Sequence, residues 1–448
     1  MLVAMCVGYF LVLLDVTIVN VALPQIGSGL RTQVSGLQWV VDAYALALAS
    51  LMLAGGTLGD LRGHKRIVLI GLVVFGLGSL GCALAPNVAA LVAGRAVQGV
   101  GAALLLPGTL AIVSRTFPER RAQARAIGVW AGVGSLALPA GPLLGGALIA
   151  AFGWRAVFMI NVPIVLLAVV ACVIVVKESA QPGTRRLDAP GAALGGLLLC
   201  ALTFAFIEGG RFGAARPEVI VAAVCAVALL VAFVLVERRL GEQAMLPLGL
   251  FRHPGFSTAN AAAGAMNLGT LGTLFVLTLF LQSVQHRSAL DAGLSLVPLF
   301  APLAVLAPLA GRLTSRIGPR VPVVGGLVIA AGGLALLLAA DARSGYLVLL
   351  PAFLLWGIGI GVLTSAVVAA AIGSVPERRE GLASAVNNTA RQAAGAIGIA
   401  VAGAIAGEPG GSGFTGGFHT VALFAACLYL VTAAASLFLI PGKPAQEG

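Results

Sequence analysis

The chain has 448 residues, of which 59% are hydrophobic and 10% are charged, and its mean hydropathy is +1.05. These values exclude a water-soluble domain, whose surface needs far more charge. The 27 basic residues outnumber the 16 acidic ones, but they lie mainly in alternate loops between apolar segments. That distribution reports membrane topology and not a nucleic-acid partner. We therefore expect an all-α polytopic membrane protein.

Fourteen apolar segments are long enough to cross a bilayer, because a helical span needs about 20 residues. In chain order they are 3–23, 37–58, 67–86, 88–113, 126–150, 154–176, 190–209, 217–236, 257–283, 292–311, 321–340, 346–372, 384–406 and 419–440. The distribution of Lys and Arg places both termini in the cytoplasm. Abundant Arg, Ala and Gly are typical of a GC-rich bacterial genome, so the predicted location is the bacterial cytoplasmic membrane, with a multi-pass topology.

Three charged residues stand inside the first four spans. Asp15 lies in "VLLDVTIVNVALPQIG" (12–27), Asp42 in "LQWVVDAYALALAS" (37–50) and Arg95 in "LVAGRAVQGVGAA" (91–103). A rise of 1.5 Å per residue puts all three at a similar depth in the outer half of the membrane. An isolated charge there costs about 3 kcal/mol, so we expect a shared polar cavity.

Two interpretations of this charge cluster are open. One is a structural ion pair between neighbouring helices; the other is a proton site, in which a desolvated carboxylate gains and loses a proton beside an arginine. We favour the proton site for Asp15 and Asp42, although Asp42 lies close enough to the outer edge to be a wetted acid at a helix end.

The turn after the second span, "GTLGDLRGHKR" (56–66), combines an acid with several cations. Its cations fix the topology, and its acid is suited to meet a helix N-terminus or the arginines of an opposite bundle as a latch on the inner gate. We expect both roles. The predicted gate residues are Asp60, Arg62, Gly63, Lys65 and Arg66.

The fifth span contains "GVGSLALPAGPLLGG" (132–146), which is dense in glycine and proline. Glycines let helices approach closely, and prolines weaken the helical hydrogen-bond ladder. The segment is either a packing helix or a hinge against which two bundles rock. The predicted hinge residues are Gly134, Pro139, Gly141, Pro142, Gly145 and Gly146.

Other polar side chains within the spans are candidates to line a substrate cavity, with interhelical hydrogen bonding as the alternative. They are Asn20, Gln98, Asn387, Asn388 and Arg391. The four histidines are scattered, and the six cysteines lie in apolar stretches without the spacing of metal ligands. We expect no metal and no cofactor.

An internal repeat organises the chain. "GTLGDLRGHKR" (56–66) returns as "GRLTSRIGPR" (311–320), and "FPERR" (117–121) returns as "VPERR" (375–379). The offsets of 255 and 258 residues predict two six-helix bundles, 1–177 and 256–448, around a linker with two inserted spans, 178–255. They also place Thr270 opposite Asp15 and Phe353 opposite Arg95, so the ionisable chemistry belongs to the first bundle.

With these motifs the chain resembles the major facilitator superfamily, and within it the fourteen-span drug:proton antiporters. "LDVTIVNVALPQI" is similar to that family's first-span signature, "GTLGDLRGHKR" to its loop signature, "RAVQGVGAA" to its arginine motif and "PAGPLLGG" to its antiporter motif. The similarity extends through "GWRAVFMINVPI" (153–164) and "ASAVNNTARQAAGAIGIA" (383–400).

The resemblance implies two bundles that rock around a central cavity, driven by the proton motive force. It assigns Asp15 and Asp42 as membrane acids, Arg95 as the arginine that assists proton transfer, and Asp60 as the gate acid. Leu61 stands where the loop signature usually has an arginine. Relatives that export divalent cations carry carboxylates in the thirteenth span, whereas this chain has Asn387 and Asn388 there.

The sequence thus predicts a monomeric, proton-coupled exporter of small lipophilic or cationic compounds such as drugs, antiseptics or a secondary metabolite. A symporter or facilitator of a small metabolite is the alternative within transport. A membrane-embedded enzyme is disfavoured, because the loops are short and carry no spacing of a nucleophile or a metal site. A channel is disfavoured because duplicated bundles suit alternating access.

Overall fold

A computed structural model describes residues 1–117, 119–176, 178, 188–376 and 379–442, and within this part of the chain all regular structure is helical. Fourteen of its helices are long and apolar enough to span a membrane. The predicted all-α, fourteen-span fold class is thereby confirmed. Part of the repeat "FPERR" and "VPERR", namely Pro118, Glu377 and Arg378, lies outside the described residues, as does most of the segment after Val176.

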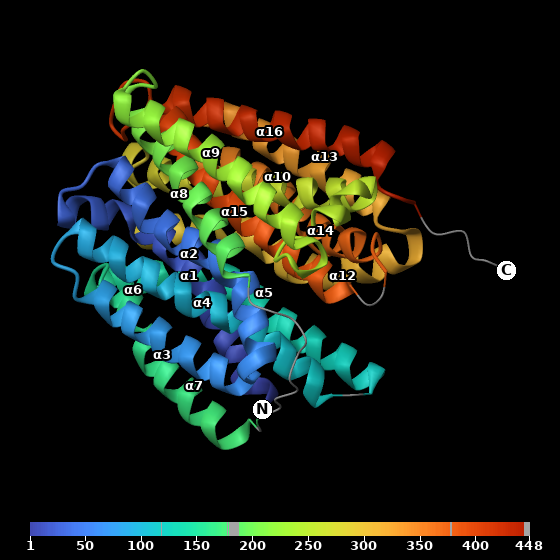
Figure 1. Cartoon of the computed structure of the whole chain (residues 1–448). Helices are drawn as coiled ribbons and strands as arrows, with labels where there is room; N and C mark the ends of the chain where they lie inside the picture. Colours follow the sequence, from blue (N-terminus) through green and yellow to red (C-terminus); the bar gives the residue numbers. More distant parts are fainter. Residues whose placement is uncertain (118, 177, 179–187, 377–378, 443–448) are drawn as a thin grey trace. The chain divides into compact units, whose positions relative to one another are not determined.

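The chain divides into two compact units. The first comprises Met1–Leu246 with Ser288–Leu294, and the second Pro247–Arg287 with Ser295–Gly448. The helices of the first unit are α1 (Leu2–Leu30), α2 (Val34–Arg62), α3 (His64–Ala83), α4 (Val88–Thr116), α5 (Arg120–Phe152), α6 (Ala156–Met159), α7 (Asn161–Val175), α8 (Ala189–Phe212), α9 (Pro217–Leu240) and the 3₁₀ turn η1 (Gly241–Gln243) (Figure 1).

The second unit repeats the pattern after a short 3₁₀ turn. Its helices are η2 (Leu248–Arg252), α10 (Pro254–Leu279), the π-helical turn η3 (Phe280–Val284), α12 (Val297–Ile317), α13 (Arg320–Leu336), the 3₁₀ turn η4 (Leu337–Ala339), α14 (Tyr346–Ile372), α15 (Glu380–Ala406) and α16 (Phe414–Leu439). The short helix α11 (Ala289–Ser295) lies almost wholly in the part of the chain that clusters with the first unit.

The same pairs of helices pack in both units. In the first, α1 packs on α5, α4 contacts both α2 and α3, and α7 packs on α3. In the second, α10 packs on α15, α14 contacts both α12 and α13, and α16 packs on α13. The duplicated sequence therefore folds into duplicated packing, as internal repeats in transporters do.

Glycines at repeat-related positions carry the closest of these contacts. A Cβ added to Gly101 of α4 would lie 2.6 Å from the backbone nitrogen of Phe75 on α3. At the corresponding place, a Cβ on Gly359 of α14 would lie 2.4 Å from the backbone nitrogen of Ala330 on α13. Small residues at such crossings allow two backbones to touch, which is how helices associate in lipid, where there is no hydrophobic drive.

The turns repeat as well. Gly63, between α2 and α3, has a φ of 93°, and Gly318, between α12 and α13, has a φ of 84°. Only glycine adopts this left-handed region without strain. Gly63 therefore separates α2 from α3 as a single residue, and Gly318 with Pro319 separates α12 from α13.

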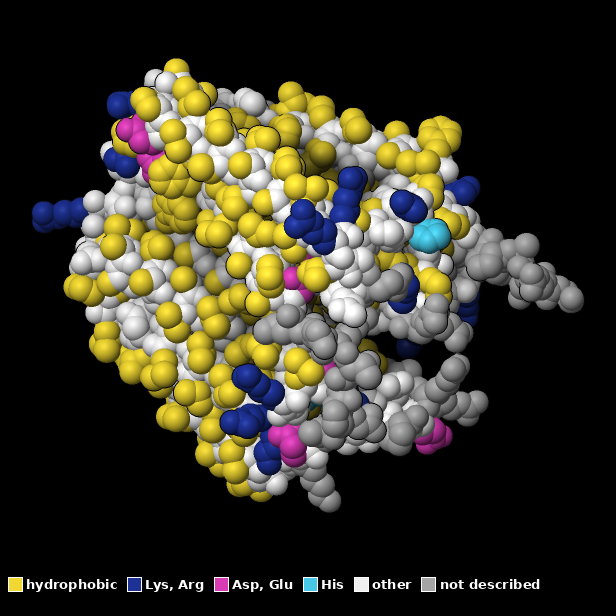
Figure 2. All heavy atoms as spheres, in the orientation of Figure 1, with side chains coloured by type: hydrophobic (Ala, Val, Ile, Leu, Met, Phe, Trp, Pro, Cys, Tyr) yellow, Lys and Arg dark blue, Asp and Glu magenta, His cyan; other side chains and the backbone are white. Residues whose placement is uncertain are grey.

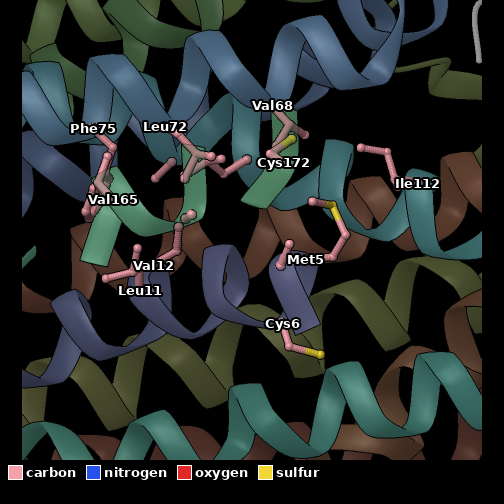
Figure 3. Close-up of a cluster of buried hydrophobic side chains, with 14 of the residues drawn as sticks. Met5, Cys6, Leu11, Val12, Val68, Leu72, Phe75, Ile112, Val165 and Cys172 are labelled. Carbon is pink, nitrogen blue, oxygen red and sulfur yellow. The ribbon is translucent and has the colours of Figure 1, made fainter. Parts of the chain in front are cut away.

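The core of the first unit is apolar, and its buried residues come from α1, α2, α3, α4, α5 and α7. Figure 3 shows Met5, Leu11 and Val12 of α1 facing Leu72 and Phe75 of α3, with further members from α4 and α7. On the outside, hydrophobic side chains cover most of the face drawn in Figure 2, with charged side chains gathered in a few places. Such an apolar exterior suits a bilayer.

The inserted helices α8 and α9 form a hairpin that packs mainly through α8, which contacts α2. Residues along α9, including Val221, Val224, Val227 and Val231, are exposed and apolar. The hairpin clusters with the first unit, and its chain enters the second unit at Pro247.

Candidate functional site: a buried charge cluster

The centre of the candidate site is an ion pair inside the first unit. α1 carries Asp15 and α4 carries Arg95, and these side chains are 0% and 1% exposed. The Arg95 Nη1 donates a hydrogen bond to Asp15 Oδ2. Of the three predicted membrane charges, the structure brings these two together.

Two amides complete the surroundings of the Asp15 carboxylate. Gln98, one turn after Arg95 on α4, donates from Nε2 to Asp15 Oδ1 at 3.2 Å. Asn161, the first residue of α7, donates from Nδ2 to the same oxygen at 3.4 Å. Both carboxylate oxygens therefore accept hydrogen bonds, and the donors come from α4 and α7.

Arg95 is held from three further sides. Its Nε donates to the carbonyl oxygen of Val40 at 2.9 Å, and its Nη1 donates to Gln98 Oε1 at 2.9 Å. Its guanidinium carbon lies 4.4 Å from the centre of the Tyr44 ring, within the range of a cation–π contact. The Tyr44 hydroxyl in turn donates to the carbonyl oxygen of Val12 at 3.2 Å, which ties α2 to α1.

Ser79 of α3 extends the network to a fifth helix. Its hydroxyl accepts from Gln98 Nε2 at 2.7 Å and from Asn161 Nδ2 at 3.4 Å, and it donates to the carbonyl oxygen of Phe75 at 2.9 Å. Ser79, Asn161 and Tyr44 were not among the residues predicted from the sequence. Their signal was present, since each is a polar side chain within an apolar span, but nothing in one sequence shows which of many such residues meet.

Asp42 does not join this network. It is fully buried, and neither of its carboxylate oxygens has a hydrogen-bond partner among the described residues. Side chains two positions apart on a helix point to roughly opposite sides, and it is Tyr44 that faces Arg95. The structure thus separates the two predicted membrane acids into a paired one and an unpaired one.

The predicted gate turn between α2 and α3 is built around Asp60. Its Oδ1 accepts from Arg115 Nη2 of α4 at 2.9 Å and contacts His64 Nε2 at 3.2 Å. Arg62 ends α2 and is exposed. The gate acid therefore pairs with Arg115 within the first unit, a residue that was not among those predicted from the sequence.

The same turn is fastened to the end of α7. The Glu178 carboxylate accepts from the backbone nitrogens of Lys65 and Arg66 at 3.3 and 3.2 Å, which caps the free N–H groups at the start of α3. Lys65 Nζ donates to the carbonyl oxygen of Val173 at 2.9 Å. A Cβ on Gly63 would lie 2.5 Å from Glu178 Oε1, so the carboxylate packs directly on that glycine.

Comparison with known proteins identifies the architecture. The family model described as Major Facilitator Superfamily matches residues 5–399 and 299–448. The chain belongs to the major facilitator superfamily. Its relatives include the multidrug resistance protein Stp of Mycobacterium tuberculosis, at 38% identity over 90% of this chain and 75% of the relative.

Two further relatives of this superfamily member come from Streptomyces. The puromycin resistance protein of Streptomyces alboniger is 38% identical over 89% of this chain and 80% of the relative. The tetracenomycin C resistance and export protein of Streptomyces glaucescens is 33% identical over 90% of this chain and 75% of the relative. The resemblance inferred from the motifs is thereby confirmed.

In this superfamily member the predicted hinge helix α5 is continuous from Arg120 to Phe152, with Pro139 and Pro142 inside it. Its glycines mark close approaches to α1. A Cβ on Gly141 would lie 2.0 Å from Thr17 Oγ1, and one on Gly145 would lie 3.0 Å from the Ile18 side chain. Gly134 lies against the ring of Tyr9 in the same way, and Gly146 against the backbone of Leu290.

The predicted cavity residues occupy different environments. Asn20 is 4% exposed and donates to the carbonyl oxygen of Val16 on its own helix at 2.8 Å. Asn387 is fully buried, and its Nδ2 donates to Asn260 Oδ1 of α10 at 3.3 Å. Asn388 is exposed and Arg391 is half-buried on the same helix α15. Among the described residues, no group of three His, Cys, Asp or Glu side chains could hold a metal ion.

The second unit has a neutral cluster at the repeat-related place. Thr270, opposite Asp15 in the repeat, shares a hydrogen bond of 2.9 Å with the hydroxyl of Tyr429 on α16. Tyr429 donates to the carbonyl oxygen of Met266 at 2.7 Å, and Phe353, opposite Arg95, is fully buried. The duplicated frame therefore carries an ion pair in one copy and a hydroxyl pair in the other.

Proposed function

We propose that this chain is a proton-coupled antiporter that exports small lipophilic or cationic compounds across the bacterial cytoplasmic membrane. The observation that carries the proposal is the Asp15–Arg95 ion pair, fully buried among membrane helices. Intramembrane ionisable residues are rare and expensive, and they mark ion and proton pathways in transporters. The relatives named for resistance and export support the direction and the class of cargo.

The pair offers a defined place for the proton. Protonation of an Asp15 oxygen removes the carboxylate charge and with it the counter-ion of Arg95. Arg95 keeps its charge in either case, because a guanidinium is not deprotonated in a protein. It then keeps Val40, Gln98 and the rings of Tyr44 and Phe158 as neighbours, so α1, α2 and α4 have one stable arrangement with the proton and another without it.

The energetics allow coupling through a single acid. One charge that crosses a membrane potential of about 150 mV releases roughly 3.5 kcal/mol, which supports a gradient of about 300-fold for a neutral compound. Asp15 is accordingly the proposed carrier. Asp42, buried and unpaired, is proposed as a second acid on the proton route, and the residues Asn20, Gln98, Asn387, Asn388 and Arg391 as polar contacts for cargo.

The remaining expectations belong to the same proposal. Both termini lie in the cytoplasm, the protein works as a monomer in the bilayer without a cofactor, and α5 serves as the hinge. The latch at Asp60 opens and closes the cytoplasmic side. A symporter would move cargo along with the proton, and the direction of transport relative to an imposed pH gradient separates the two mechanisms.

The test uses purified protein in proteoliposomes and an efflux-deficient host. We expect Asp15→Asn to insert and fold, yet to lose pH-driven export and the proton movement that accompanies addition of cargo. Asp291→Asn makes the same chemical change at an exposed position and is the matched control. Full pH-driven export by Asp15→Asn would remove Asp15 from the mechanism, and accumulation along the proton gradient would replace antiport by symport.

A further inference from the structure

A pair of buried acids lies where the inserted α8–α9 hairpin begins and ends. Asp188 is the N-cap of α8, and Glu237 lies in the last turn of α9. They are 8% and 1% exposed. Neither belongs to the Asp15 cluster or to the gate turn, and no motif of the sequence pointed to them.

Three of the four carboxylate oxygens of Asp188 and Glu237 accept hydrogen bonds from backbone N–H groups. Asp188 Oδ1 accepts from the nitrogen of Gly191 at 2.8 Å and Oδ2 accepts from the nitrogen of Met245 at 2.9 Å. Glu237 Oε2 accepts from the nitrogen of Leu246 at 2.8 Å. The fourth oxygen, Glu237 Oε1, is buried and has no donor among the described residues.

That fourth oxygen faces Asp188. A Cβ on Gly191 would lie 2.5 Å from Glu237 Oε1 and 2.5 Å from Asp188 Oδ2, so both oxygens stand over the same glycine. Two carboxylate oxygens cannot bond to each other unless a proton lies between them, because an ionised carboxylate only accepts. Buried acids that share a site do not both ionise.

The two helix ends decide which acid holds the proton. Asp188 lies at the N-terminus of α8, where the partial positive charge of the helix favours a carboxylate and where two N–H groups donate to it. Glu237 lies at the C-terminus of α9, where the partial negative charge disfavours one. Among the described side chains the charged group that acts on Glu237 is Asp188, while its neighbours Arg238 and Arg239 are exposed.

We propose that Asp188 and Glu237 form a proton-binding site, in which Glu237 Oε1 carries the proton and donates it to the ionised Asp188 Oδ2. The site joins the two helices at the end of the α8–α9 hairpin. Through the N–H groups of Met245 and Leu246 it also holds the segment that leads to Pro247, which we call the strap. Loss of the proton places two ionised carboxylates over Gly191, and their repulsion releases the strap. The site therefore responds to pH on the side of the membrane where α8 begins.

Infrared spectroscopy of the full-length protein in nanodiscs tests the proton directly. At neutral pH we expect a protonated-carboxyl band that disappears in Glu237→Gln, because the amide has no acid proton. The band should also disappear in Asp188→Asn, because an amide keeps the cap on Gly191 but removes the charge that keeps Glu237 protonated. Glu218→Gln, at the exposed first turn of α9, is the matched control and should keep the band.

Amide hydrogen exchange tests the strap. In the wild type we expect protection of Met245 and Leu246, corrected for the intrinsic rate, to fall as pH rises. Glu237→Gln mimics the protonated acid, since its amide donates to Asp188 and accepts from Leu246, so protection should become independent of pH. Equal pH profiles in both proteins, a band unchanged in Glu237→Gln, or a site that takes up Mg²⁺ or Na⁺ in place of the proton would overturn the proposal. Neither readout depends on whether Asp15 carries the transported proton.

Discussion

The buried pair of Asp15 and Arg95 predicts an asymmetry between its two single substitutions. In Asp15→Asn the buried Arg95 loses its counter-ion. Its side chain is 1% exposed, and its guanidinium cannot be deprotonated. Breaking a buried ion pair by removing one partner costs about 3–5 kcal/mol of unfolding free energy. Arg95 keeps two acceptors, Val40 and Gln98, each at 2.9 Å, so we expect the lower end of that range, about 3 kcal/mol.

In Arg95→Met the buried Asp15 carboxylate loses its counter-ion, and it can lose its charge by taking up a proton. The native state of this variant then binds a proton that the unfolded chain, with its ordinary ionised carboxylate, does not bind at neutral pH. Stability falls with rising pH wherever the native state binds more protons. We therefore expect the penalty of Arg95→Met to grow as pH rises, whereas that of Asp15→Asn stays nearly constant.

Equilibrium unfolding in mixed detergent micelles, followed by far-ultraviolet circular dichroism, measures both effects. The double variant Asp15→Asn, Arg95→Met removes both charges and should recover most of the lost stability, because a neutral replacement of a buried pair is often harmless. Asp60→Asn, in a pair with 34% and 38% exposed side chains, is the control and should cost less than about 1 kcal/mol. Equal, pH-independent penalties that add in the double variant would refute the argument.

Three further predictions concern a glycine at a helix crossing, the cap of α3 and the ring over Arg95. Gly101→Ala should destabilise the first unit by about 1–3 kcal/mol, since its methyl group would lie 2.6 Å from the backbone of Phe75. Gly332→Ala, with open space around it, is the control and should be neutral or slightly stabilising. Thermal unfolding compares the two variants. Glu178→Ala removes the cap of α3 and should cost about 1 kcal/mol, with faster amide exchange in the first turn of that helix; unchanged exchange would contradict the capping role. Tyr44→Phe should keep most of the transport activity of the wild type, because the ring over Arg95 remains. Tyr44→Leu loses about 0.5–2 kcal/mol of cation–π attraction and should reduce that activity. Equal activities of the two variants would exclude the contact from the mechanism.

Much of the fold could be predicted from the sequence, because a bilayer restricts a chain to apolar helices whose length is set by its thickness. The repeat offset could be predicted too, and the structure expresses it in detail, since Gly63 and Gly318 take up the same left-handed turn. What the offset could not predict is the packing role of the inserted hairpin. An apolar helix such as α9 reads the same whether it faces lipid or protein, and only the contacts of α8 with α2 show which side is covered.

For the site, the charged spans could be identified from the residues alone, because a carboxylate or guanidinium in hydrocarbon is too costly to be incidental. The packing of the helices was needed to show that Asp15 pairs with Arg95 while Asp42 does not. It also shows that the network includes Ser79, Asn161 and Tyr44. Partners in such a network come from five different helices. Their meeting depends on the rotation of each helix about its axis, which is set by close packing at glycines and not by any local pattern of residues.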